Sequence, residues 1–475
     1  MDGNQRILIK NLDILTASEK FHADILIEGE KISAIGSGLP DDGCTVIDGS
    51  GLTAMPGGVD VHTHFDLPMF GTVSSDDHYT GHKAAAFGGT TTVIDFVPFD
   101  KETMEESIRV WREKADPKAA IDFSFHMNLS RWDEQIAREI PKLIEWGMPS
   151  IKVFTAYNNR LRINDGEIFS AMRIARECGI LTMLHAENGD VIETLVAEAL
   201  AQGKTTPEWH AHTRPSWGAV EATLRGIALA AQAGAPLYVV HMNAAGEVDQ
   251  LAYGREKGVA VMGETCPQYL FFTIDHLRRP DGAKWVCSPP MRTAEDNQRL
   301  WEGLAQGILQ TIGTDHCPFF YDGTKAIIYE GKEIAIPGKE LGRDYFTKIP
   351  NGLPGVGDRL PILWTYGVRA GRISENQFVA LNSTNPAKIF GLYPQKGALL
   401  PGSDADIVLW DLNKRLIYGA SVAQHRTDYN LYEGWELVGY PLKVFLRGKL
   451  IVDGEQWLGK PGQGRFIKRA SGIVL

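Results

Sequence analysis

The feature that most constrains the fold is a series of short apolar runs that alternate with segments of helical periodicity. The runs are rich in branched and aromatic residues, as β-strands are. They are GVDVHTH (58–64), TTVIDFV (91–97), IDFSFHM (121–127), SIKVFTA (150–156), ILTMLHAE (180–187), PLYVVHM (236–242), VAVMGET (259–265) and LQTIGTDH (309–316). KETMEESIRVWREKA (101–115) and DGEIFSAMRIARECG (165–179) have the spacing of amphipathic helices. Eight strand–helix units predict an α/β fold, a (β/α)8 TIM barrel. A doubly wound sheet is the competing fold, but no glycine-rich phosphate fingerprint follows the first run.

The two ends of the chain have a different pattern. Short alternating runs, punctuated by Gly and Asp, occur in the first 50 residues and again in DADIVLWDL (404–412) and PLKVFLRGKLIVDGE (441–455). Such punctuation is typical of β-hairpins. We therefore expect a smaller β-sandwich built from both termini, in residues 1–54 and 393–475, around a barrel in residues 55–392. Loosely tied terminal strands are the alternative.

Charge and cysteine content narrow the class of protein. The net charge of −11 argues against a nucleic-acid partner. No apolar run approaches the length of a membrane span, and the start of the chain lacks the apolar core of a secretory signal. The five cysteines form no CxxC pair, which favours reduced thiols over a disulfide framework or a thiolate zinc site. We expect a cytoplasmic protein with no membrane partner.

Polar side chains stand at the carboxyl ends of five of the eight runs. They are His62, His64, Lys152, His185, His241 and Asp315. Barrel active sites form at this end of the strands, and alternate residues such as the first two histidines share one strand face. Imidazole and carboxylate ligands suit zinc and its first-row neighbours, so the set predicts a metal centre. Eight other histidines are interpreted as structural or secondary: His78, His82, His126, His210, His212, His276, His316 and His425.

Lys152 is the unusual member of this set. A protonated ammonium would repel a metal, but desolvation lowers a lysine's pKa and makes a neutral amine available. That amine can add CO2 and become a carbamate, whose two oxygens can bridge two metals. A Schiff-base lysine and a salt-bridged structural lysine are the alternatives. The ring of histidines favours the metal interpretation, because a Schiff base needs no such ligands.

Longer motifs carry a resemblance to a known family. The strongest are PGGVDVHTHFD (56–66), KVFTAY (152–157), LHAEN (184–188), VVHMN (239–243), GETCPQYL (263–270), CSPPMR (287–292), TDHCPF (314–319) and PNGLPG (350–355). Over essentially its whole length, the chain resembles the cyclic amidohydrolases of the dihydropyrimidinase and D-hydantoinase (phenylhydantoinase-like) branch. The resemblance implies a hydrolase with two divalent metal ions, Zn²⁺ or another first-row ion such as Mn²⁺, in a TIM barrel.

The resemblance also implies a role for each site residue. His62, His64 and Asp315 would hold one ion, His185 and His241 the other, and a hydroxide and the CO2-derived carbamate on Lys152 would bridge them. Asp315 would also transfer protons, and Tyr157 would donate a hydrogen bond to the developing oxyanion. The main-chain groups of Ser288 and Asn351 would bind the imide edge of the ring.

The implied substrates are small cyclic ureides and imides. Dihydrouracil, dihydrothymine or 5-substituted hydantoins would be opened to N-carbamoyl amino acids by a homotetramer or homodimer. An allantoinase-like ureide hydrolase is one alternative, and dihydroorotase is disfavoured because no arginine follows the HTH pair. A non-catalytic scaffold of the collapsin-response type is another, although the filled ligand set argues against it.

Three segments are expected to form lids over the site: residues 66–77, 158–163 and 321–349. Leu67, Phe70 and Phe154 are the candidates to pack against a ring substituent. The tail, residues 459–475, would either reach a neighbouring subunit or remain solvated or packed against its own subunit.

Overall fold

A computed structural model describes residues 6–69 and 71–475 and contains a barrel of eight parallel strands. In barrel order the strands are β6 (Gly58–Thr63), β9 (Thr90–Val97), β10 (Asp122–Asn128), β11 (Ser150–Phe154), β12 (Leu181–His185), β13 (Leu237–Val239), β14 (Val261–Thr265) and β15 (Thr311–Ile312). The sheet closes where Thr63 forms a parallel bridge with His316. All eight predicted strands are present, and the predicted TIM barrel is confirmed.

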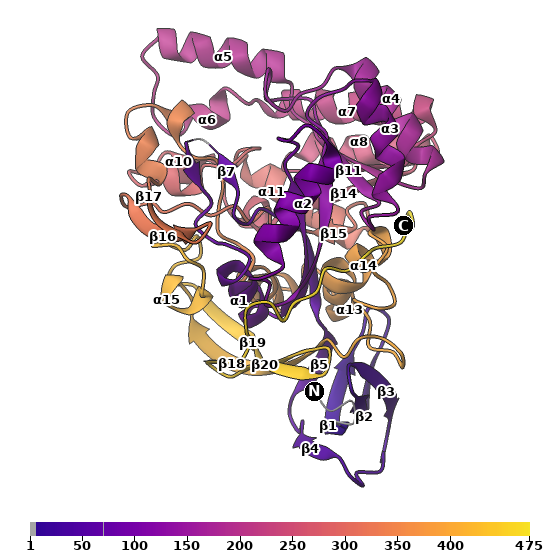
Figure 1. Ribbon diagram of the computed structural model, residues 1–475. Coiled ribbons are helices and arrows are strands. Elements are labelled where there is room, and N and C mark those ends of the chain that lie inside the picture. The colour runs from indigo at the N-terminus through magenta and orange to yellow at the C-terminus, as the bar shows by residue number, and fades with distance from the viewer. Residues whose placement is uncertain (1–5, 70) are drawn as a thin grey trace.

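Helices follow the strands and cover the outside of the barrel (Figure 1). The longer ones are α1 (Thr80–Phe87), α2 (Met104–Ala115), α4 (Asp165–Glu177), α5 (Gly189–Ala201), α7 (Ser216–Ala233), α8 (Ala245–Glu256) and α11 (Ala294–Ala305). The shorter ones are α3 (Glu134–Glu139), α6 (Trp209–His212), α9 (Pro267–Phe271), α10 (Ile274–Leu277), α12 (Arg359–Leu363), α13 (Glu375–Val379), α14 (Asn385–Ile389) and α15 (Ala420–Ala423). The helices predicted in 101–115 and 165–179 are α2 and α4. Their first turns are fixed by side-chain caps from Thr103 and Asn164. None of the helices in the described part of the chain has both the length and the hydropathy that a membrane crossing requires.

Apolar side chains fill the barrel below the polar strand ends. This interior cluster includes Val59, Val61, Ile94, Phe96, Leu181, Met183, Tyr238, Val240 and Met262. Because alternate residues of a strand point inward, these side chains support the carboxyl-end residues from beneath.

The C-terminal tail closes the opposite end of the barrel. Ile467 of the tail joins the interior cluster, as does Phe390, which directly follows α14. Arg469 is buried, and it donates hydrogen bonds to the hydroxyls of Ser124 on β10 (2.9 Å) and Ser150 on β11 (2.8 Å). This part of the tail therefore packs against its own barrel. Packing against its own subunit was one of the alternatives that the sequence left open for the tail.

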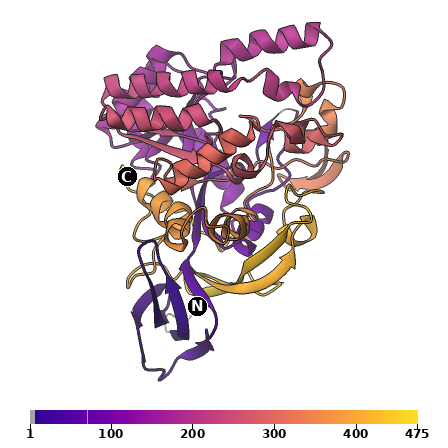
Figure 2. The same ribbon diagram turned by 180° about the vertical axis from the view of Figure 1, so that it is seen from behind.

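Strands from both ends of the chain form one nine-stranded sheet. Its members are β1 (Arg6–Leu15), β2 (Lys20–Glu28), β3 (Lys31–Gly36), β4 (Thr45–Asp48), β5 (Thr53–Pro56), β18 (Ile407–Ile417), β19 (Glu436–Leu446), β20 (Lys449–Asp453) and β21 (Gln456–Trp457). Antiparallel pairing of β5 with β18 joins the two halves, which lie at one end of the molecule (Figures 1 and 2). The predicted smaller β-domain is confirmed as this continuous sheet. Its strands share a buried core that includes Ile9, Ile25 and Ile407, so they are not loosely tied.

Two of the expected lid segments pack against each other. The first contains the short strands β7 (Pro68–Met69) and β8 (Thr72–Val73), and the second contains the hairpin β16 (Lys325–Tyr329) and β17 (Lys332–Ile336). Val73 packs against Ile327 and Ile336 in a small separate core. The Thr72 hydroxyl also donates a hydrogen bond to the Pro337 carbonyl over 2.6 Å. Phe70, expected to contact a ring substituent, lies outside the described residues.

Candidate active site

Four of the six expected metal ligands meet above the apolar barrel interior. Lys152 Nζ lies 3.0 Å from His62 Nε2. Asp315 Oδ1 lies 3.2 Å from the same nitrogen and 3.1 Å from His64 Nε2. β6 carries the first histidine, β11 carries the lysine, and the turn after β15 carries the aspartate. Three segments of the chain thus bring nitrogen and oxygen donors to one point.

The remaining two expected ligands form an adjoining pair. His185 ends β12 and His241 follows β13, and His185 Nδ1 lies 2.9 Å from His241 Nε2. One donor atom each from His62, His241 and Asp315 lies within 4.8 Å of the others. The structure therefore brings all six residues into one centre, as the pattern of strand ends predicts.

The ionisation states suit metal coordination. Burial lowers the pKa of His64 to about 4 and the pKa of His241 well below its usual value, which keeps both rings neutral. Although burial opposes it, the rings of His62 and His64 hold the pKa of Asp315 well below its usual value. Burial lowers the pKa of Lys152 to about 8, which makes its neutral amine accessible. Imidazole nitrogens, a carboxylate and an amine form a donor set that fits divalent first-row metals.

Two glutamates that the sequence interpretation missed support these histidines. Glu264 Oε1 lies 2.6 Å from His62 Nδ1, and Glu187 Oε2 lies 2.9 Å from His185 Nε2. A metal-binding histidine usually donates its other ring N–H to such a carboxylate, which fixes the ring orientation. The sequence does contain a signal for both glutamates. Glu187 is two residues beyond His185, and Glu264 lies near the end of the seventh barrel strand.

A glycine makes room for one of these carboxylates. A Cβ atom at Gly313 would lie 2.6 Å from Glu264 Oε2 and 3.0 Å from His62 Cβ. Real Cβ atoms essentially never approach a neighbour to 2.6 Å, so a larger residue at this position would displace the glutamate carboxylate. Gly313 is therefore part of the geometry that lets Glu264 reach His62.

Three of the expected site residues have left-handed backbone conformations. The φ angles are +65° for Tyr157, +39° for His241 and +52° for Asp315. Such angles are uncommon for residues other than glycine and cost free energy unless the surroundings enforce them. Backbone strain of this kind concentrates at functional sites, and here it coincides with the strand ends that carry the polar side chains.

Ser288 and Asn351 also lie together. Asn351 Nδ2 donates a hydrogen bond to Ser288 Oγ over 3.1 Å. His210, interpreted as secondary, places Nε2 within 2.8 Å of the Cys287 carbonyl oxygen and 3.2 Å of Ser288 Oγ. The side chains therefore tie together the two main-chain segments that the resemblance assigns to ring binding.

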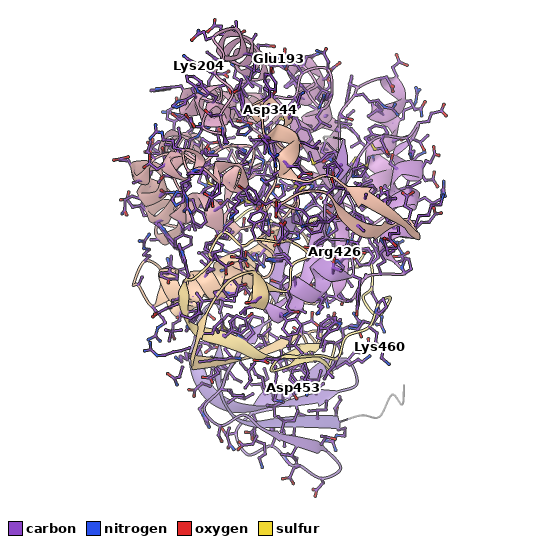
Figure 3. All side chains as sticks on the ribbon, turned by 90° about the vertical axis from the view of Figure 1, so that its left-hand side faces the viewer. Glu193, Lys204, Asp344, Arg426, Asp453 and Lys460 are labelled. Atoms are coloured by element: carbon purple, nitrogen blue, oxygen red, sulfur yellow. The ribbon has the colours of Figure 1, made fainter. Side chains whose placement is uncertain are left out.

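A cavity of about 460 Å³ opens beside this group. Its lining includes Tyr157, Asn351, Glu187 and His210, together with Ile192 and Val196 of α5. Burial raises the pKa of Tyr157, so its hydroxyl remains protonated and can donate. Glu193, labelled in Figure 3, lines this cavity near one end of the molecule, far from the labelled Asp453 of the terminal sheet.

The expected contacts for a ring substituent differ from the observed cavity wall. Phe154 is buried and packs its ring against His185, with centroids 5.7 Å apart, and Leu67 is partly buried against the main core. Neither lines the cavity, whereas α5 does. No sequence signal pointed to α5, because its residues have the pattern of an ordinary amphipathic helix.

His316, also interpreted as secondary, anchors the turn that contains Asp315. Its Nδ1 accepts a hydrogen bond from the Gly355 amide over 3.0 Å, and its Nε2 lies 3.2 Å from Asp76 Oδ2. Its carbonyl accepts from the His64 amide over 2.8 Å. The ring thus links the Asp315 turn to the first expected lid and to the loop that follows Asn351.

Known proteins are similar to this chain in both fold and sequence. The model of the amidohydrolase family matches residues 53–451. A D-hydantoinase of Geobacillus stearothermophilus is 45% identical over 98% of this chain and 96% of its own length. The crystal structure of a dihydropyrimidinase from Brevibacillus agri NCHU1002 matches with a TM-score of 0.95 and 46% identity, covering 99% of this chain and 100% of that one. An L-hydantoinase (dihydropyrimidinase) from Arthrobacter aurescens matches with a TM-score of 0.86 and 29% identity, over 98% and 99% of the two chains. The chain therefore belongs to the amidohydrolase family, within the branch of cyclic amidohydrolases that includes the D-hydantoinases and dihydropyrimidinases.

Proposed function

We propose that this enzyme opens the cyclic amide of 5-substituted hydantoins and dihydropyrimidines, giving N-carbamoyl amino acids. The observation that carries the proposal is the convergence of six ligand-type side chains from five strand ends beside a cavity lined by Tyr157 and Asn351. Relatives at 45% and 46% identity are named D-hydantoinase and dihydropyrimidinase, so we propose activity on both ring types.

We assign three ligands to one divalent ion and two to the other. His62, His64 and Asp315 would hold the first ion, and His185 and His241 would hold the second. A carbamate formed from CO2 and the Lys152 amine would bridge them, and burial favours the neutral amine from which it forms because burial disfavours the ammonium form. Zn²⁺ is the preferred ion and Mn²⁺ the next candidate. Two ions held in this way would supply activation of a water molecule and polarisation of the carbonyl under attack.

The side chains of the enzyme then control protons and charge. Asp315 is ionised and lies at the centre of the cluster, so it can take the proton of the attacking water. The same carboxyl returns that proton to the ring nitrogen as the carbon–nitrogen bond breaks. Tyr157 donates its hydroxyl hydrogen to the carbonyl oxygen as negative charge develops there.

Main-chain groups hold the ring. We assign the amide and carbonyl groups of Ser288 and Asn351 to the imide edge, which hydantoins and dihydropyrimidines share. The hydrogen bond between their side chains fixes the distance between the two segments. Binding through this common edge explains how one site can accept rings of two sizes.

The test is turnover by metal-loaded enzyme on hydantoin, dihydrouracil and a 5-phenyl hydantoin of each enantiomer, with allantoin as a comparison ring. We expect two metal ions per chain and release of the N-carbamoyl amino acid from the first three compounds. Activity on allantoin alone would replace the proposal with an allantoinase, and no turnover of any ring would favour a non-catalytic scaffold. Full activity with fewer than two ions per chain would contradict the two-metal assignment.

Three further properties belong to the same proposal. We propose that the structural units are residues 55–392 for the barrel, with 1–54 and 393–475 forming the smaller β-domain. We propose a homotetramer or a homodimer in solution, which sedimentation can measure. We also propose a cytoplasmic location, in keeping with five cysteines that are all free thiols in the structure.

A further inference from the structure

Three lysines in the described part of the chain have almost no solvent exposure, and they differ in what surrounds them. Lys396 lies among the carboxylates of Asp122, Asp404 and Asp406, and Lys152 belongs to the ligand cluster. Lys339 is 1% exposed, and no carboxylate oxygen of a described residue lies within 4.0 Å of its Nζ. Lysine is almost never fully buried without a partner, so this third case needs an explanation.

The surroundings of Lys339 do not stabilise a charge. Burial lowers the pKa of Lys339 to about 7. The neighbouring titratable groups are the thiols of Cys287 and Cys317, and burial raises the pKa of both, to about 12 for Cys287. These thiols are therefore uncharged at neutral pH and offer no counter-charge. A methionine at this position would avoid the desolvation cost, so packing alone does not account for the lysine.

Among the described residues, the Lys339 side chain forms one hydrogen bond, and its acceptor lies at a specific place in the site. Nζ donates to the Val286 carbonyl oxygen over 2.8 Å. The Gly352 amide donates to the same oxygen over 3.2 Å, which uses both of its lone pairs. Val286 precedes Ser288 by two residues, and Gly352 directly follows Asn351. This carbonyl is therefore the point where the two ring-binding segments join.

Lys339 also belongs to the expected lid. It begins the short 3₁₀ helix Lys339–Gly342 that follows the β16–β17 hairpin. Its main-chain amide donates to the Phe320 carbonyl over 2.7 Å, which fixes the start of this helix to the segment following Asp315. The main chain of Lys339 is therefore held at Phe320, and its side chain connects the expected lid to the Val286 carbonyl.

We propose that Lys339 is a positioning residue for substrate binding, which holds the main chains of Ser288 and Asn351 at the spacing that grips the cyclic imide. The proposal rests on the function proposed above, because it assigns those two main chains to the ring. An interaction of this kind acts on bound substrate and transition state alike, so its loss raises KM and leaves kcat nearly unchanged.

The experiment compares Lys339→Met with wild type and with Lys332→Met, which removes an exposed lysine from the hairpin that precedes Lys339. In metal-loaded enzyme, we expect the KM for hydantoin and dihydrouracil to rise about tenfold in the first variant, the scale of one lost hydrogen bond to a buried acceptor. Lys332→Met should match wild type. Lys339→Arg, which keeps a donor, should recover part of the affinity. Lys339→Leu, which also lacks a donor, serves in its place if the methionine variant does not fold.

Thermal stability separates positioning from a purely structural role. The pKa of Lys339 in the folded protein lies below that of an unfolded lysine, about 10.4. As the pH falls from about 10 to about 7, the unfolded state binds a proton at this lysine more readily than the folded state does, so the free energy of unfolding of wild type decreases. Lys339→Met lacks the titrating group and does not show this decrease. We expect the Tm of the variant to equal or exceed that of wild type at pH 7, with the difference shrinking towards pH 10.

Two results would overturn the positioning role. One is an unchanged KM in Lys339→Met, and the other is a fall in kcat and Tm at constant KM. Neither would affect the proposed function, which fails if wild type itself opens neither the hydantoins nor dihydrouracil.

Discussion

Glu264 Oε1 lies 2.6 Å from His62 Nδ1, and the same oxygen accepts the main-chain N–H of His241 over 3.1 Å. Those two histidines belong to different halves of the proposed metal centre. Glu264 is wholly buried, and its second oxygen accepts the Tyr238 hydroxyl over 3.0 Å. Glu187 differs, because among the ligand side chains it contacts only His185. One carboxylate therefore supports both halves of the centre and the other supports one.

Glu264→Gln should weaken the binding of both metal ions, while Glu187→Gln should weaken the binding of one. The loss of a carboxylate that orients a ligating histidine typically costs about 10- to 100-fold in metal affinity. Zinc titration of metal-free protein against a chromogenic chelator measures both affinities without relying on activity. Loss of a single ion from Glu264→Gln would contradict the shared role.

Lys152→Ala should lose bound metal and activity together, because it removes the proposed bridge between the two halves. A small carboxylic acid added to this variant should restore part of both, since it supplies the missing bridging oxygens. Elemental analysis and turnover of dihydrouracil are the two measurements. Lys332→Ala, at the exposed hairpin, is the control. Full activity without the added acid would exclude the bridge.

Tyr157→Phe should lower kcat about 10²- to 10³-fold, the usual cost of removing one oxyanion donor. Metal content should not change, because the phenol is not a ligand. Steady-state kinetics on hydantoin measure the effect, and Tyr253→Phe, at a tyrosine 47% exposed on α8, is the matched control. An unchanged kcat would remove Tyr157 from the reaction and leave it as a wall of the cavity.

Lys396→Met should destabilise the fold by about 3–5 kcal/mol, because it removes the cation from buried Asp406, whereas Asp122 keeps Arg447 and Asp404 keeps Lys31. The lysine joins Asp122 of β10 to Asp404 and Asp406, next to the terminal sheet. Denaturant unfolding at pH 7 measures the loss. Lys339→Met is the contrasting variant, since no carboxylate depends on it.

The same cluster predicts a pH dependence. Although burial opposes it, Lys396 lowers the pKa of Asp122 and Asp404. Stability from these carboxylates is present above about pH 4, the unfolded value, and is lost as the pH falls through their folded values. The raised pKa of Lys396 contributes stability that is present below about pH 10.4 and is lost as the pH rises through its folded value. Lys396→Met should show a weaker loss in acid, and an equal loss would contradict this account.

The barrel and the ligand cluster were predictable from the sequence for one reason. Strands buried on both faces are continuous apolar runs, so a polar residue at the end of a run is conspicuous. Parallel strands place all such ends at the same edge, so the strand pattern alone brings His62, Lys152 and His241 together. The prediction of Leu67 and Phe154 as substituent contacts had no such support, because lid residues follow no periodic pattern.

What the sequence determined by itself is the order of strands and helices and the side chains at the mouth of the barrel, since both follow from local patterns of apolar and polar residues. Only the tertiary structure decided which distant groups support them. Glu264 reaches His62 across a separation of 202 residues, and Lys339 reaches Val286 across 53. A buried charge is favourable or costly according to its neighbours, and those neighbours are set by chain packing rather than by residues nearby in the sequence.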